Sequence, residues 1–141
     1  MKKYIMKIML MAIMSITLSI AANAQQTNKI IAVINRADWC PVCQQNGEKV
    51  MKEVMPVFNQ SSVQFVMNDL TDDASKEKSK MALKEMKVYD AVKKTTSTGL
   101  ILLVDEASGK LISKISVAEP LEKLVQAIKE SAMAEKMMNK M

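Results

Sequence analysis

The sequence predicts an α/β fold in which helices flank a four-stranded mixed sheet, with the element order β-α-β-α-β-β-α. Three observations carry this prediction. Short apolar runs rich in β-branched residues alternate with stretches whose apolar residues recur at helical spacing. Only a turn separates the last two runs, which predicts a hairpin. The only two cysteines follow the first run and are separated by two residues.

The first 24 residues have the pattern of a secretory signal peptide. Three lysines precede an apolar stretch, residues 8–20, and Ala22-Asn23-Ala24 is a small-x-small cleavage site. The apolar stretch is short for a membrane span, which needs about 20 residues. We therefore expect cleavage after Ala24, export to the periplasm or another extracytoplasmic compartment of a bacterium, and no stable membrane span afterwards.

The rest of the chain, residues 25–141, has the length of one small domain. Residues 1–24 hold three lysines and no acid, so the net charge falls from +5 to +2 without them. The chain has no histidine and does not interleave basic with aromatic residues, which argues against a nucleic-acid partner. We expect a monomeric single domain with a frayed tail at 133–141.

The first strand is expected at residues 30–35, where apolar residues run without alternation, as in a strand buried on both faces. A helix is expected over 41–58, because Pro41 suits a first helical position and apolar residues then recur at helical spacing. Pro56 removes a backbone donor inside this pattern, which predicts a kink or an early end. A second strand follows at 63–70.

A second helix is expected from residue 74 to residue 89 or 92. Thr71-Asp72-Asp73 suits its start, because the two aspartates lie at the positive end of the helix dipole. A polar loop, residues 93–99, leads to the hairpin.

The hairpin strands are expected at 100–104 and 110–117, with Gly109 taking a positive φ in the turn. Glu119-Pro120 opens a last helix, whose apolar stripe ends at Ala132. A right-handed crossover makes the first two strands parallel. The cysteines then lie at the carboxyl end of the first strand, where open α/β sheets place their sites.

The stretch Trp39-Cys40-Pro41-Val42-Cys43 predicts a reactive dithiol. With Pro41 opening the helix, Cys40 lies at its start and Cys43 about one turn further on. Unpaired backbone N–H groups and the helix dipole favour a thiolate at Cys40. The thiolate is the nucleophile, and Cys43 can then attack a mixed disulfide formed on Cys40.

Other uses of a Cys-x-x-Cys pair fit the sequence less well. A structural zinc site needs about four ligands, but the chain has two cysteines and no histidine. Covalent haem attachment needs a histidine where this chain has Gln44. A purely structural disulfide across so small a loop would stabilise the fold little.

On the stretch Ala37-Asp38-Trp39-Cys40-Pro41-Val42-Cys43 and the element order after it, the chain resembles the thioredoxin fold family. The resemblance covers residues 29–132 and is to the short exported bacterial members. It implies a cofactor-free thiol-disulfide oxidoreductase acting on exported proteins with disulfides or thiols. Cys40 would attack, Cys43 would resolve, and the two would form a redox-active disulfide. Trp39, Pro41 and Asp38 would support the site.

The chain departs from the family pattern at two places. The family's buried acid, which assists the resolving thiol, corresponds to Ile34, and Asp38 in an exposed turn is a poor substitute. The family's cis-proline has no counterpart, since Ser97, Thr98 and Gly99 stand there. We expect trans peptides, because a cis bond before a non-proline residue costs about 2.5–4 kcal/mol. These three residues are the expected partner-binding loop.

The sequence leaves three functions open. The first is an exported oxidoreductase, for which the uncharged Pro-Val pair between the cysteines favours a reducing or intermediate potential. Such a reductant would draw on a membrane electron donor. The second is a binding module that kept the fold and lost efficient turnover. The third is Cu(I) handling by the cysteine pair with help from methionines in the tail. These methionines are Met133, Met137, Met138 and Met141.

Overall fold

The computed structural model describes residues 29–138, so the expected signal peptide and residues 139–141 lie outside the described part. The elements are β1 (Ile30–Arg36), α2 (Pro41–Lys49), the π-helical turn η2 (Val50–Val54), the 3-10 turn η3 (Met55–Phe58), β2 (Val63–Asp69), α3 (Asp73–Glu85), α4 (Tyr89–Val92), β3 (Leu100–Asp105), β4 (Leu111–Ser116) and α5 (Leu121–Met138). The strand order is β2-β1-β3-β4. Strand β1 pairs parallel to β2 and antiparallel to β3, and β3 and β4 form the hairpin. The predicted α/β fold, a four-stranded mixed sheet flanked by helices, is confirmed.

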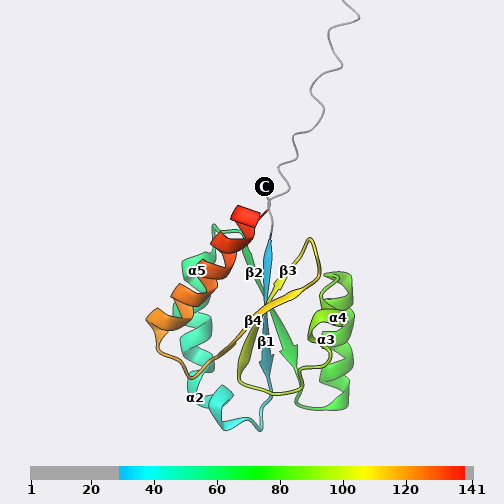
Figure 1. The fold of residues 1–141 in the computed structure, drawn as a ribbon. Coiled ribbons are helices and arrows are strands. Elements are labelled where there is room, and N and C mark those ends of the chain that lie inside the picture. The colour runs from blue at the N-terminus through cyan, green and yellow to red at the C-terminus, as the bar shows by residue number, and fades with distance from the viewer. Residues whose placement is uncertain (1–28, 139–141) are drawn as a thin grey trace, which may run out of the picture.

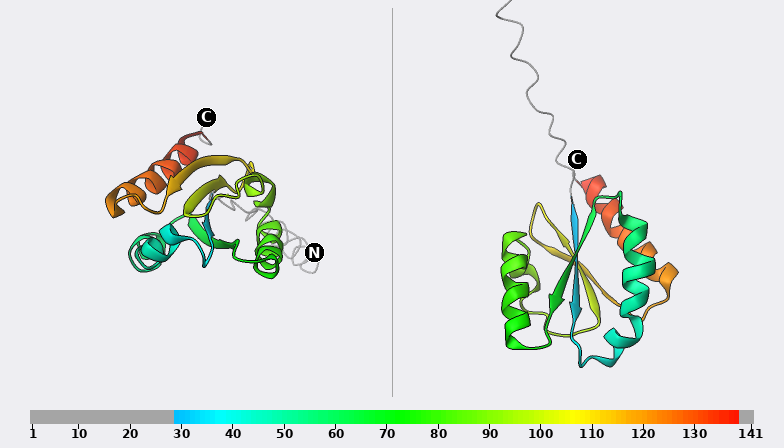
Figure 2. Two further views of the ribbon diagram at one scale, coloured as in Figure 1. Left: turned by 90° about the horizontal axis from the view of Figure 1, so that it is seen from below. Right: turned by 180° about the vertical axis from the view of Figure 1, so that it is seen from behind.

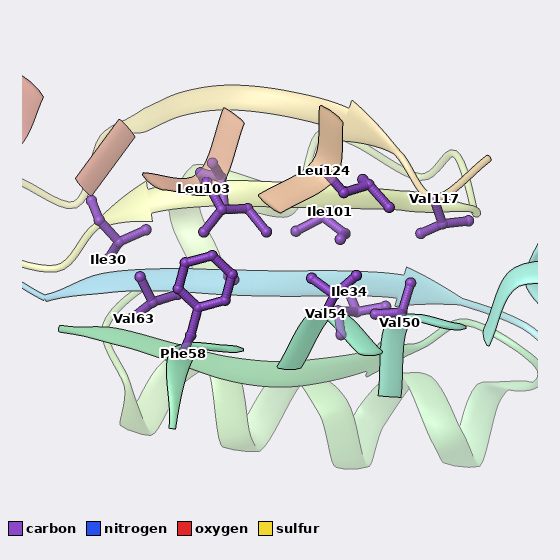
Figure 3. Packing of buried hydrophobic residues seen from close by; sticks show 12 residues of the cluster. Ile30, Ile34, Val50, Val54, Phe58, Val63, Ile101, Leu103, Val117 and Leu124 are labelled. Carbon is purple, nitrogen blue, oxygen red and sulfur yellow. The ribbon is translucent and has the colours of Figure 1, made fainter. Parts of the chain in front are cut away.

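Helices cover both faces of the sheet, with α2 and α5 on one side and α3 and α4 on the other (Figures 1 and 2). Strand β1 supplies both cores, because successive side chains of a strand point to opposite faces. Ile30, Ala32 and Ile34 pack in the core beneath η2, η3 and α5, where Figure 3 shows Ile30 and Ile34. Ile31 and Val33 pack in the core beneath α3 and α4. The strand is therefore buried on both faces, as its continuous apolar run predicts.

The first helix ends at Phe58 as expected, but it absorbs Pro56 by changing its hydrogen-bond period. Regular α-helix stops at Lys49 and is followed by the π-helical and 3-10 turns. Proline has no N–H to continue the α-helical ladder, and a change of period avoids that missing bond. Val50, Val54 and Phe58 thereby stay buried against the sheet.

The expected second helix is wrong in its length, because α3 stops at Glu85 and α4 is a separate short helix. Lys87 has φ of 59°, in the left-handed region. Its N–H donates to the carbonyl of Lys84 at 3.0 Å, and the Val88 N–H donates to the carbonyl of Leu83 at 3.0 Å. This is the Schellman ending, for which glycine is the usual signal. A lysine in that position gives the sequence no such signal.

The last helix continues beyond the expected stripe, so residues 133–138 are helical rather than a frayed tail. Its far end is held by Glu135, which is buried. Between residues 29 and 138 we find no helix with the length and apolar composition needed to cross a membrane.

Glu135 and Asp105 form a buried pair of acids at the start of β1, away from the cysteines. Each is 5% exposed. Burial favours neutral Asp105, but the N–H groups of Ser108 and Ala107 donate to its carboxylate at 2.9 and 3.0 Å and hold its pKa below the usual range. Burial and the Asp105 carboxylate raise the pKa of Glu135. Glu135 can therefore keep its proton and donate it toward Asp105.

Glu135→Gln is expected to change how stability depends on pH. An acid with a raised folded pKa contributes stability fully below its unfolded pKa, and this contribution is lost as the pH rises through the folded pKa. The wild type should lose stability as the pH rises through the pKa of Glu135, which burial and Asp105 raise above 4.5. Glutamine keeps an uncharged donor and should be about 1 kcal/mol more stable above that pKa. Urea unfolding across the pH range checks this, with exposed Glu122→Gln on the same helix as control. Equal pH slopes for wild type and Glu135→Gln would contradict the shared proton.

Candidate redox site

Cys40 caps the helix that carries Cys43. It has extended backbone angles, Pro41 follows at the first helical position, and the Cys43 N–H donates to the Cys40 Sγ at 3.2 Å. The sulfur thus takes the place of the side-chain oxygen that usually caps a helix. The sequence-based placement of both cysteines at the amino end of the first helix is confirmed. Both are free thiols in this structure.

The two thiols differ in their tendency to ionise. Burial opposes ionisation of Cys40, but hydrogen bonds from the side chains of Cys43 and Thr98 and from the Cys43 and Val42 backbone outweigh it and lower the Cys40 pKa. Burial and the neighbouring Cys40 raise the pKa of Cys43. Cys40 is 4% exposed and Cys43 is half-buried. Ionisation, rather than exposure, therefore favours Cys40 as the attacking group.

A polar network fixes the turn that carries Trp39. Arg36 pairs with Asp69 at 2.7 Å and also with Asp38. The Asp38 N–H donates to Thr71 Oγ1 at 3.0 Å, and Trp39 Nε1 donates to the Thr71 carbonyl at 3.1 Å. Burial opposes ionisation of Asp69, but hydrogen bonds from Thr71 and the charge of Arg36 lower its pKa. The Trp39 ring stays 61% exposed beside Cys40, where it is available to a partner.

The loop at residues 95–99 faces the cysteines from the other side. Gly99 has φ of 76°, and a Cβ there would lie 3.2 Å from Cγ1 of Val42, which stands between the two cysteines. Exposed Ser97 and half-buried Thr98 precede it. The described residues contain no cis peptide bond, so the expectation of trans geometry is confirmed. The sequence-predicted loop is thus brought against the dithiol motif.

Ile34, where the sequence predicts that a buried acid is missing, lies beside Cys43. Ile34 is buried, and it lines a cavity of about 60 Å³ together with Cys43. The exposed side chains of Met51 and Met67 line the same cavity. Asp38 lies in the exposed turn and pairs with Arg36, so it does not replace the acid.

The structure does not bring Met133 and Met137 to the cysteines, whereas Met141 lies outside the described residues. The carboxyl end of α5 lies at the opposite end of the sheet from the amino end of α2 (Figure 1). Exposed Met133 and Met137 belong to that distant end. Among residues 29–138, no group of three or more cysteine or acidic side chains is placed to hold a metal ion. The described geometry therefore gives no support to a copper site that joins the cysteines to the tail.

Two buried polar residues near the site, Asn35 and Asn68, escaped the sequence reasoning. Asn35 is fully buried and Asn68 is 7% exposed. Asn35 follows the apolar run and shares a face of β1 with Ile31 and Val33. A polar residue on a buried face was the sequence signal that could have identified it. Its partnership with Asn68 depends on the register between two strands.

No family model and no curated protein matches this sequence. Among solved structures, the chain is similar to the crystal structure of Trxlp from Edwardsiella tarda EIB202. The two share 18% sequence identity over 72% of this chain and 84% of that chain, with a TM-score of 0.45.

Proposed function

We propose that this protein is an exported thiol-disulfide oxidoreductase that reduces disulfides in other exported proteins. The observation that carries the proposal is the helix-capping position of Cys40, whose sulfur accepts the Cys43 N–H. A thiolate gains more from that bond than a neutral thiol does, because charge-assisted hydrogen bonds are the stronger ones. The thiolate is also the form that attacks disulfides.

The exchange proceeds in two steps. The Cys40 thiolate attacks one sulfur of a partner disulfide, forming a mixed disulfide and releasing the other partner sulfur as a thiolate. Cys43 loses its proton and attacks the Cys40 sulfur, forming the Cys40–Cys43 disulfide and releasing the second partner thiolate. Two electrons pass from the dithiol to the partner. A donor at the membrane would return the disulfide to the dithiol.

The surroundings of Cys40 support a reducing or intermediate potential. The groups that lower its pKa are uncharged donors, namely the side chains of Cys43 and Thr98 and two backbone groups. No cation is among them. A strongly oxidising pair requires a very stable thiolate in the reduced form, which uncharged donors support less than a cation does.

The reduction potential of the Cys40–Cys43 pair tests the proposal. Trp39 is the only tryptophan and adjoins Cys40, so its fluorescence should follow the redox state in glutathione or dithiothreitol buffers. We expect a value between about −270 and −180 mV, the range from thioredoxin to protein disulfide isomerase. A value near −120 mV would indicate an oxidant instead. The absence of a reversible two-electron couple would rule out the oxidoreductase and favour a binding module or Cu(I) binding by the cysteine pair.

A further inference from the structure

The amides of Asn35 and Asn68 form a buried pair across strands β1 and β2. Asn68 Nδ2 donates to Asn35 Oδ1 at 2.8 Å. The two residues face each other in the parallel register of these strands. Asn35 lies at the end of β1 that leads into the dithiol motif, four residues before Trp39.

Asn35 also holds the loop opposite the cysteines at three points. Its Nδ2 donates to the Thr95 carbonyl at 2.8 Å and to the Ser97 carbonyl at 3.2 Å. Its own carbonyl accepts the Gly99 N–H at 2.8 Å. Both side-chain N–H groups and the side-chain oxygen of Asn35 are therefore used. The loop carbonyls on either side of Thr96 are bound to one residue of the central strand.

The loop held in this way reaches both cysteines. Gly99 lies against Val42, which stands between the two cysteines. The Thr98 side chain is one of the groups that lower the pKa of Cys40. The Gly99 backbone lowers the pKa of Cys43, although burial and Cys40 raise it overall. Loop and motif belong to segments more than fifty residues apart in the chain, so their alignment depends on what joins them. Asn35 is bonded to the loop and lies on the strand that carries the motif.

We propose that Asn35 and Asn68 are positioning residues of the redox site, and that they set the place of Thr98 relative to Cys40. The proposal rests on the proposed function in that it assigns the pair a role in the same site. Asn68 orients the Asn35 amide so that both of its N–H groups point at the loop. Residues 95–99 contain no proline that would restrict the loop backbone. The Asn35 side-chain hydrogen bonds to the Thr95 and Ser97 carbonyls restrict it instead.

A purely structural role explains these residues less well. An apolar pair would fill the same buried place without the cost of removing two amides from water. The amides are compensated because the loop carbonyls and each other serve as partners. Moreover, the side chains next along the same face of β1, Val33 and Ile31, are apolar. The polar pair occurs only at the end of β1 that adjoins the loop.

The ionisation of Cys40 in variants of the reduced protein, expressed from its full chain, tests the positioning role. We measure the pH dependence of the fast phase of alkylation, which reports Cys40 because the Cys43 pKa is the higher one. Asn35→Leu should raise the midpoint by about one pH unit, since the Thr98 hydrogen bond to the thiolate is lost. Asn68→Leu should raise it less. If Asn35→Leu fails to fold, the alkylation midpoint of Asn68→Leu alone tests the positioning role.

A double-mutant cycle with Thr98→Val separates positioning from general loosening. If Asn35 acts through Thr98, the midpoint of the double variant Asn35→Leu/Thr98→Val should equal that of Thr98→Val. Val104→Ala is the matched control, because it removes buried atoms from the same core at the far end of β1. It should lower stability and leave the midpoint unchanged.

Two outcomes overturn the proposal. One is a wild-type midpoint in both asparagine variants despite lower stability. The other is a shift of equal size in Val104→Ala. The measurement does not require turnover. If the wild type cannot reduce a protein disulfide but the asparagine variants show these midpoint shifts, the proposed function is refuted and the positioning role stands.

Discussion

Replacing Cys40 with serine is expected to reduce disulfide exchange to the uncatalysed background, whereas replacing Cys43 with alanine should stop the reaction at the mixed disulfide. A serine hydroxyl does not ionise near neutral pH and cannot attack a disulfide. In Cys43→Ala the backbone N–H that donates to Cys40 Sγ remains, so the attacking thiolate keeps its main geometric support. Only the group that releases the partner is lost.

Insulin reduction and trapping of partners from a periplasmic extract check this prediction. Met133→Leu is a suitable control, since this exposed residue belongs to the last turns of α5. The carboxyl end of α5 lies at the opposite end of the sheet from the amino end of α2 (Figure 1). Because Cys40 is the more buried of the two thiols, the trapping experiment also tests whether Cys40 is the attacking thiol and Cys43 the resolving one. Mixed disulfides on Cys40→Ser rather than on Cys43→Ala would reverse the roles. Mixed disulfides on neither variant would count against a peptide-binding redox role.

Gly99→Ala is expected to combine a large loss of stability with a disturbed site. A left-handed residue with a side chain costs about 1–2 kcal/mol at φ of 76°. The new methyl group would also meet Val42 Cγ1 at 3.2 Å, and such overpacking costs about 1–3 kcal/mol. Because Val42 stands between the cysteines, part of that strain must move the start of α2.

Gly109→Ala provides the matched control for Gly99→Ala. Gly109 has φ of 64°, but the nearest atom to a Cβ there is the Lys87 carbonyl oxygen at 3.9 Å. It should show the backbone cost alone, with unchanged Trp39 fluorescence. Urea unfolding of both variants measures the difference, and Trp39 fluorescence reports the site. Equal losses of stability would mean that the Val42 contact relaxes freely.

Local sequence signals were sufficient for most of the fold. Continuous β-branched runs gave the buried strands, and Gly109 marked the hairpin turn that the structure has between β3 and β4. Cys40 followed by Pro41 predicted the helix start correctly, because capping and the fixed φ of proline act within one turn. The signals failed where the local residue was atypical. Lys87 ends a helix in the left-handed region without being glycine, and Pro56 changes the helical period without breaking the helix.

The sequence by itself determined the order of elements and the residues of the dithiol, since propensity, capping and hydrophobic period are properties of neighbouring residues. Tertiary structure alone decided which distant groups meet there. Asn35 reaches Asn68 through the register of β1 and β2 and reaches Thr95 across the sheet end. Glu135 holds the end of α5 in the same way, through Asp105 thirty residues earlier. These contacts depend on strand register and packing angles, and such quantities exist only after the whole chain has folded.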